Sequence, residues 1–125
     1  MNILVVEDNP IDRKLFCYLF RTDGHGVVER GSAEAALEEM RKRCPDIILL
    51  DLNLPGLDGL ALVRLMKADP DLRHIPVVAV TGAQEWFSQE DALAAGCNAF
   101  FPKPVDTRAL PGGVARVLQT APRAG

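Results

Sequence analysis

Short β-branched apolar runs alternate with segments of helical periodicity along the whole chain. Five runs have the length and composition of strands: 2–6, 26–29, 47–50, 75–81 and 99–101. Between them, apolar residues recur at helical spacing, as Ile11, Leu15 and Leu19 do in the first such segment. This alternation predicts a parallel sheet with helices on both faces, connected by right-handed crossovers.

The predicted fold class is α/β: a doubly wound, flavodoxin-like sheet of five parallel strands with five helices. The first, third and fourth runs are almost continuously apolar, as central strands covered on both faces are. The second and fifth runs suit edges, and Pro102 just past the fifth removes no ladder donor there. The predicted strand order is therefore 2-1-3-4-5, in which ligands bind beyond the carboxyl ends of the strands, between the first and third.

Capping residues mark the ends of several predicted helices. Gly24 suits the left-handed position after the first helix, and Ser32 suits the N-cap of the second. A later helix is predicted over residues 85–95 and ends at Gly96. A Pro-Gly-Gly segment stands where the first turns of the last helix would be, so that helix is predicted to start late, near Pro111, or to kink there.

The length and composition are those of one globular domain. The chain has 125 residues, 48% of them hydrophobic and 25% charged, so we expect one domain over 1–121 and a frayed tail at 122–125. The net charge of -3 argues against a nucleic-acid surface. No apolar run reaches membrane-spanning length and no signal-peptide pattern follows Met1, so a cytoplasmic protein without DNA or membrane partners is expected. The three cysteines lack metal-type spacing and are interpreted as free thiols.

Polar groups follow the predicted strands at the points where these end. Glu7 and Asp8 follow the first strand, and Asp51 follows the third. Thr81 ends the fourth strand, and Lys103 comes just after the fifth. Because the carboxyl ends of parallel strands meet at one edge of the sheet, we expect these side chains to converge.

The predicted cluster of carboxylates requires a cation, since each carboxylate raises the pKa of the others. Hard oxygen ligands of this number suit Mg²⁺, with a phosphate completing its shell. Glu7, Asp8 and Asp51 carry three negative charges, which one divalent ion and Lys103 balance. A nucleophilic Asp51 beside a metal ion, Lys103 and the Thr81 hydroxyl predicts phosphoryl transfer onto that aspartate.

Four motifs at these strand ends together resemble the receiver domain of two-component response regulators. They are "VVEDNP", "LLDLNLPGLDG", "AVTG" and "FPKP", and the resemblance covers essentially the whole chain. The resemblance implies that Asp51 is the phosphoacceptor. It further implies that Asp8 binds Mg²⁺ directly, that Glu7 binds it through water, and that Asn53 contributes its backbone carbonyl.

The same resemblance implies a phosphorylation switch. Thr81 would hydrogen-bond one phosphoryl oxygen, Lys103 would pair with another, and the bond between Lys103 and Pro104 would be cis. On phosphorylation Thr81 would move inward, and Phe100, three residues before the lysine, would follow it. The face formed by the last two helices and the strand between them would then carry the output.

The resemblance also implies protein partners rather than an enzymatic activity on other molecules. In such systems the phosphoryl group arrives from histidine, but His25 and His74 are predicted at the opposite end of the sheet. The expected donor is therefore a sensor histidine kinase, a histidine phosphotransfer protein or a small acyl phosphate. The expected output is a downstream protein or a phosphorylation-dependent dimer. "NPIDRKLF" and "HIPVVAVTG" more weakly resemble single-domain regulators of bacterial cell-cycle relays, and whether the chain is stand-alone or an excised receiver stays open.

Other residues near these motifs are expected to have structural roles. Phe16 and Phe20 are expected in the core rather than in a docking surface. Asp12 is expected to serve the first turn of the first helix, where an acid complements the helix dipole. Asp58 and Gly59 are expected to form the turn into the third helix, without chemistry.

Three other interpretations stay open. A receiver-like adaptor that never takes phosphate would have the same fold, although every expected site residue is present. A small Mg²⁺-dependent phosphatase of the haloacid dehalogenase type would have a second aspartate two residues after the nucleophile, where this chain has Asn53. A flavodoxin-like flavin binder needs a phosphate-binding loop rich in Ser, Thr and Gly, whereas "EDNP" is acidic.

Overall fold

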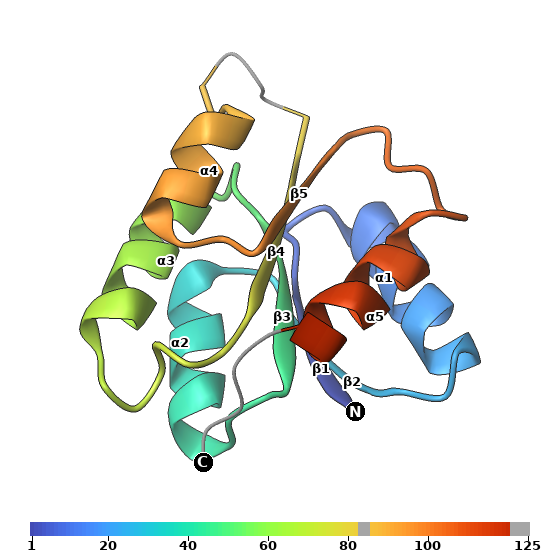
Figure 1. Cartoon of the computed structure of the whole chain (residues 1–125), viewed down its shortest axis with the longest axis horizontal. Helices are drawn as coiled ribbons and strands as arrows, with labels where there is room; N and C mark the ends of the chain where they lie inside the picture. The colour runs from blue at the N-terminus through green and yellow to red at the C-terminus, as the bar shows by residue number, and fades with distance from the viewer. Residues whose placement is uncertain (83–85, 121–125) are drawn as a thin grey trace.

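The computed structural model describes residues 1–82 and 86–120, which form five strands and five helices in alternation (Figure 1). The strands are β1 Asn2–Val6, β2 Gly26–Arg30, β3 Ile47–Asp51, β4 Val77–Thr81 and β5 Ala99–Pro102. The helices are α1 Pro10–Thr22, α2 Ala33–Lys42, α3 Gly59–Ala68, α4 Gln89–Ala95 and α5 Leu110–Thr120. The strands are parallel in the order β2-β1-β3-β4-β5, which confirms the predicted fold class and strand order.

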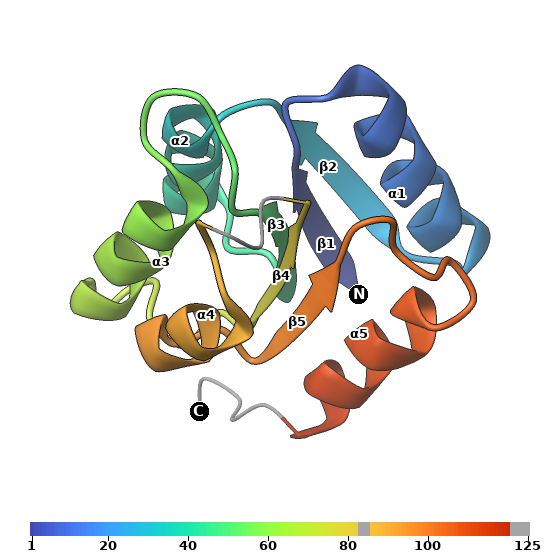
Figure 2. The same ribbon diagram turned by 90° about the horizontal axis from the view of Figure 1, so that it is seen from above.

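Helices cover both faces of the sheet, so the domain has three layers (Figure 2). α2, α3 and α4 lie on one face, and α1 and α5 lie on the other. The central strands divide their side chains between two cores: Leu4 and Leu50 belong to the first, and Ile3 and Leu49 to the second. No helix within the described ranges is long and apolar enough to cross a membrane.

Helix caps lie where the sequence predicts them. The Ser32 side chain caps α2, and Gly24 and Gly96 have the left-handed φ angles of 88° and 117° after α1 and α4. Asn9 caps α1 by accepting a hydrogen bond from the backbone amide of Asp12 at 3.2 Å. Because this cap follows Asp8 directly, the first turn of α1 lies beside the carboxyl end of β1.

The apolar repeat in α1 correctly predicts a helix but does not mark its buried face. Ile11 is 77% exposed and Leu15 is 40% exposed. Phe16 and Phe20 are buried, as predicted, together with Cys17, in the core that contains side chains of β1 and β3. The two phenylalanines lie one turn apart and bury more apolar area, which explains why their face turns toward the sheet.

Two elements begin later than predicted. β4 begins at Val77 rather than at residue 75. α4 begins at Gln89, because the Ser88 side chain caps it by accepting from the amide of Asp91. The predicted start of that helix at residue 85, and the predicted tail at 122–125, lie outside the described residues.

The late start predicted for α5 is confirmed. The helix begins at Leu110, and Pro111 is its second residue, where the missing amide hydrogen breaks no helical hydrogen bond. Gly113 lies in the first turn against β5, where an added Cβ would stand 2.4 Å from Cζ of Phe101. The helix therefore approaches the sheet as closely as a glycine allows.

Candidate phosphoryl-transfer site

The predicted site residues lie together at the carboxyl rim of the sheet. Asp51 is the last residue of β3, and Thr81 is the last residue of β4. Glu7 and Asp8 directly follow β1, and Lys103 directly follows β5. The parallel register brings these separate stretches within reach of one another, at the edge that the strand order predicts.

Three carboxylates form the acidic part of the site. Glu7, Asp8 and Asp51 each offer an oxygen, and these oxygens lie within 4.8 Å of one another. Glu7 and Asp51 are 1% and 3% exposed, whereas Asp8 is open to solvent. Such hard oxygen ligands, with one side open, are those with which proteins hold Mg²⁺ while it keeps positions for water or phosphate. The residues present therefore fit the predicted metal ion.

Lys103 supplies the positive charge of the site. Its Nζ lies 2.5 Å from Oε1 of Glu7, 3.0 Å from Oδ2 of Asp51 and 3.1 Å from Oδ2 of Asp12. Its backbone amide donates to the carbonyl of Thr81 at 2.9 Å, which fixes the lysine beside the end of β4. The peptide bond that follows, to Pro104, is cis.

The contact with Asp12 was missed by sequence reasoning, which gave this residue only a role in the first helical turn. That turn follows Asp8 within four residues and so lies over the rim. The sequence signal for this contact was the position of Asp12, four residues after Asp8 and in the first turn of α1. The contact also depends on the path of the chain from β5 to Lys103.

Burial shapes the electrostatics of the cluster. The pKa of Glu7 is raised from 4.5 to about 8, chiefly because burial desolvates the carboxylate and further because it shares a hydrogen bond with Asp51, although Lys103 opposes the increase. Burial alone would lower the pKa of Lys103, but its hydrogen bond to Glu7 and the charge of Asp51 outweigh that effect and raise the pKa. Lys103 therefore stays a cation, while Glu7 needs a further cation besides Lys103 to be ionised at neutral pH.

The connection between β3 and α3 orients the carboxylate of Asp51. The amide of Asn53 donates to Oδ1 of Asp51 at 2.9 Å, so one carboxylate oxygen is already oriented by the backbone. Asp58 caps α3, and an added Cβ on Gly59 would stand 2.5 Å from Cα of Leu52. The roles predicted for Asp58 and Gly59 in the turn are confirmed.

The two predicted switch residues lie on neighbouring strands. Thr81 is fully buried at the end of β4. Phe100 pairs with Ala79 in the β4–β5 register, is partly buried and packs against the core under α2, α3 and α4. Phe101, the next residue, packs on the opposite face of the sheet. Movement of Thr81 and Phe100 on phosphorylation stays a prediction.

A groove runs beside the site, between α1 and the connection from β5 to α5. It is lined by Asp12, Leu15, Phe16, Lys103, Pro104 and Val105. Lys103 therefore borders both the acidic cluster and this groove. Any molecule seated in the groove would lie directly next to the carboxylates.

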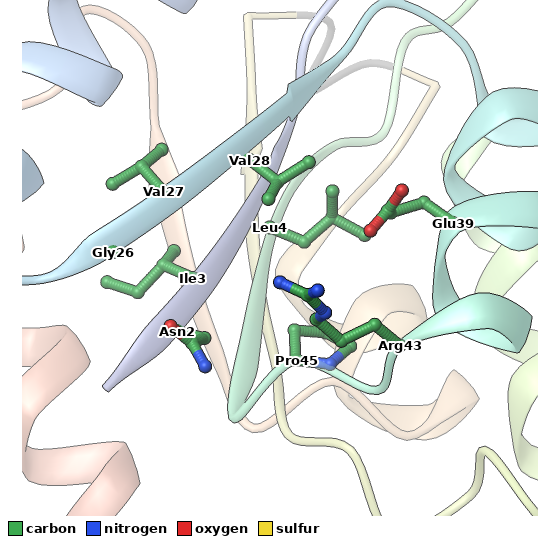
Figure 3. A pocket seen from close by; sticks show the side chains of 9 residues that line it. All are labelled: Asn2, Ile3, Leu4, Gly26, Val27, Val28, Glu39, Arg43 and Pro45. Atoms are coloured by element: carbon green, nitrogen blue, oxygen red, sulfur yellow. The ribbon is translucent and has the colours of Figure 1, made fainter.

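A second hollow lies at the other end of the sheet, where β1 and β2 begin (Figure 3). Glu39 and Arg43 flank an apolar floor that includes Leu4 and Val28 (Figure 3). Glu39 is already paired with Arg30 at 2.8 Å. The hollow contains no residue predicted to take part in phosphoryl chemistry, so it is separate from the site.

The two histidines also lie away from the carboxyl rim. His25 directly precedes β2, and His74 precedes β4. Since all strands run in the same direction, both residues are at the amino ends of their strands. Their predicted position opposite Asp51 is confirmed.

A five-stranded sheet of this order, with an acidic cluster and a lysine at its carboxyl rim, is the architecture of a signalling receiver. The chain belongs to the family of response regulator receiver domains, which it matches over residues 3–115. Members of this family are generally signalling domains rather than enzymes.

Relatives and solved structures agree with this assignment. The polar-differentiation response regulators DivK of Brucella ovis and Brucella abortus are each 38% identical over 104 residues, which is 83% of this chain and 85% of theirs. A putative response regulator from Chloroflexus aurantiacus has a TM-score of 0.89 at 26% identity, over 94% of this chain and 97% of that one. The receiver domain of a sensor histidine kinase from Pseudomonas aeruginosa has a TM-score of 0.86 at 29% identity, over 95% and 98%, and contains a magnesium ion coordinated in its active-site cleft.

Proposed function

We propose that this receiver domain accepts a phosphoryl group from a histidine of a partner protein onto Asp51, with Mg²⁺ beside it, and then signals through a protein contact. One observation carries the proposal: the Asp51 carboxylate lies within 4.8 Å of oxygens of Glu7 and Asp8 and 3.0 Å from Nζ of Lys103. Groups in this arrangement can neutralise the charge that collects as a phosphoryl group arrives. The magnesium ion of the Pseudomonas aeruginosa relative supports the same cation here.

Glu7, Asp8, Asp51 and the backbone carbonyl of Asn53 are the groups that would hold Mg²⁺. When bound, the ion supplies positive charge that offsets the phosphoryl oxygens. Asp8 is proposed as a direct ligand because it is open to solvent. Glu7 is proposed to bind through water, since Lys103 contacts its Oε1 and the amide of Asn9 donates to its Oε2 at 3.2 Å.

In the transfer step, a carboxylate oxygen of Asp51 attacks phosphorus. The bond from phosphorus to the donor imidazole breaks, and its electron pair returns to the imidazole nitrogen. Lys103 pairs with one phosphoryl oxygen and the Thr81 hydroxyl donates to another as negative charge accumulates. His25 and His74 are at the far end of the sheet, so the donor histidine belongs to another molecule.

A docking surface for that donor is proposed on α1. Ile11, Leu15 and Tyr18 are 77%, 40% and 68% exposed, and their spacing places them on one side of the helix. Together with the adjoining groove they form an apolar surface next to the carboxylates. An exposed apolar helix face of this kind suits a helical partner, here a histidine kinase or a histidine phosphotransfer protein.

The surface formed by α4, β5 and α5 is proposed to bind the downstream partner. Phosphorylation would draw Thr81 toward the new group, and the ring of Phe100 would follow into the vacated space. Leu93 on α4 is already 46% exposed and would contribute to the contact. A downstream protein or a second copy of the chain would bind there, in the cytoplasm where a histidine kinase presents its phosphoryl group.

Tryptophan fluorescence tests the proposal. Trp86 is the only tryptophan, lies five residues after Thr81 and is 75% exposed. Its emission is expected to change when Mg²⁺ and beryllofluoride, a phosphoryl mimic, are added together. Asp51→Asn is expected to abolish that response, whereas Asp71→Asn, a change at an exposed acid before β4, is expected to keep it. A full response in Asp51→Asn would overturn the assignment of Asp51.

A further inference from the structure

Asp12 lies at the boundary between the phosphoryl site and the groove beside α1. Its Oδ2 is 3.1 Å from Nζ of Lys103. Its side chain is 36% exposed, against 1% for Glu7 and 5% for Asp51, the two other carboxylates on that lysine among the described residues. Asp12 also lines the groove. It therefore both contacts Lys103 and faces the side from which a donor would arrive.

The ammonium of Lys103 has three hydrogens, and three carboxylates already accept them. A phosphoryl group on Asp51 needs one of these hydrogens, so one carboxylate must release it. Glu7 is buried, and leaving its charge without a partner is costly. Asp12 is open to water, which can replace the lysine at small cost. Asp51 itself loses its charge when it is phosphorylated, and of the two carboxylates that keep theirs, Asp12 releases Lys103 at the lower cost.

Asp12 also adds negative charge in front of the site. Glu7, Asp8 and Asp51 together balance one divalent ion and Lys103, so the charge of Asp12 is in excess. That charge repels an incoming phosphate dianion. A small donor contacts little beyond the site, whereas a protein donor that covers the groove buries apolar surface and so offsets the repulsion.

We propose that Asp12 is a specificity-determining residue, which restrains Lys103 and disfavours small anionic phosphodonors relative to a donor docked on the groove. The inference rests on the proposed function, because it concerns the same transfer onto Asp51. It assigns to Asp12 a charge effect on the choice of donor rather than a role in holding the metal ion.

The test compares the wild type, Asp12→Asn and Asp12→Ala as full chains with Mg²⁺ and two small donors. Acetyl phosphate is a dianion near neutral pH, and phosphoramidate carries less negative charge. The rate of phosphoprotein formation is followed on phosphate-affinity gels. Asp23→Asn removes the same charge at the far end of α1 and serves as the matched control.

Both Asp12 variants are expected to react with acetyl phosphate roughly three- to tenfold faster than the wild type. The gain should shrink at high salt and be smaller with phosphoramidate, because it is electrostatic. Asp23→Asn should react like the wild type. If Asp12 had only a structural role, its substitution would change the rates with both donors by the same factor, and this change would not depend on salt.

An unchanged or slower rate in both Asp12 variants, while the wild type is phosphorylated on Asp51, would overturn the inference and leave the proposed function intact. An equal, salt-independent gain with both donors would overturn it as well. If neither the wild type nor the variants take phosphate from either small donor, this inference is overturned, whereas the proposed function fails only if a phosphorylated histidine protein also leaves Asp51 unmodified.

Discussion

Nζ of Lys103 lies 3.0 Å from Oδ2 of Asp51, although 52 residues separate the two in the chain. The contact exists because β3 and β5 end at the same rim and β4 lies between them. The amide of Lys103 donates to the carbonyl of Thr81, so the pairing of β5 with β4 fixes the position of the lysine at the rim. The charge balance of the site is therefore a property of the fold and is formed only when β5 has joined the sheet.

The raised pKa of Glu7 predicts a pH-dependent stability. The folded protein holds this proton up to about pH 8, whereas the unfolded glutamate loses it near 4.5. A group whose pKa is higher in the folded state stabilises it at low pH and loses that effect as the pH rises. In EDTA, the free energy of unfolding measured in urea should therefore fall between about pH 4.5 and about pH 8.

Glu7→Gln is the control for this effect, because it keeps the shape of the side chain and removes the titration. Its stability should vary less over the same pH range. Mg²⁺ should stabilise the wild type more at pH 8 than at pH 6, since protons compete with the ion for the carboxylates. Parallel stability curves for the wild type and Glu7→Gln would contradict the assignment.

The first turn of α5 offers a matched pair of glycines. Gly113→Ala would place a Cβ 2.4 Å from Cζ of Phe101, so we expect a loss of about 1–3 kcal/mol in the free energy of unfolding. Gly112→Ala has no neighbour within 4 Å and should instead raise stability by up to about 1 kcal/mol. Urea denaturation of both variants measures the difference, and equal effects would show that α5 does not pack closely on β5.

Thiol reactivity should separate the cysteines. Cys44 is exposed, whereas Cys17 and Cys97 are buried, and burial raises the pKa of each of these two thiols to about 11. With a colorimetric disulfide reagent at pH 8, one thiol should react quickly and the other two only in denaturant. Cys44→Ser should lose the fast phase. A fast phase that remains in this variant would mean that the core opens readily.

The exposed face of α1 should matter for transfer rather than for stability. Ile11→Ser is expected to change the free energy of unfolding by less than about 0.5 kcal/mol, because the side chain is 77% exposed. It should slow phosphorylation by a phosphorylated histidine protein and leave the rate with acetyl phosphate unchanged. Phe16→Ala, from the buried face, should cost about 3–5 kcal/mol. If Ile11→Ser reacts with the phosphorylated histidine protein as fast as the wild type does, the docking surface lies elsewhere.

The architecture and most of the site were predictable because the sequence changes sharply from apolar to polar residues where the strands end. Each apolar strand leads directly into polar residues, as at Asp51 and Thr81, and the carboxyl ends of parallel strands share one rim. Local capping rules placed Ser32 and Gly96 correctly, since these interactions lie within one turn of the helix ends.

The parts that the sequence did not reveal depend on packing between distant segments. In α1, two apolar faces compete: the expected burial of Phe16 is confirmed, but helical spacing alone does not show that Ile11 faces solvent. The contact between Asp12 and Lys103 needs both the tight cap of α1 and the course of the chain after β5. Neither is visible in the local pattern of residues.

The most direct measurement locates the phosphorylated residue. A phosphorylated histidine protein and Mg²⁺ are added to the chain, the product is reduced with borohydride, and peptides are sequenced by mass spectrometry. Because borohydride reduces an aspartyl phosphate to homoserine, we expect homoserine at position 51 in the wild type and at no position in Asp51→Asn. Homoserine at another aspartate, or unmodified Asp51 after the donor has lost its phosphate to this chain, would contradict phosphoryl transfer onto Asp51.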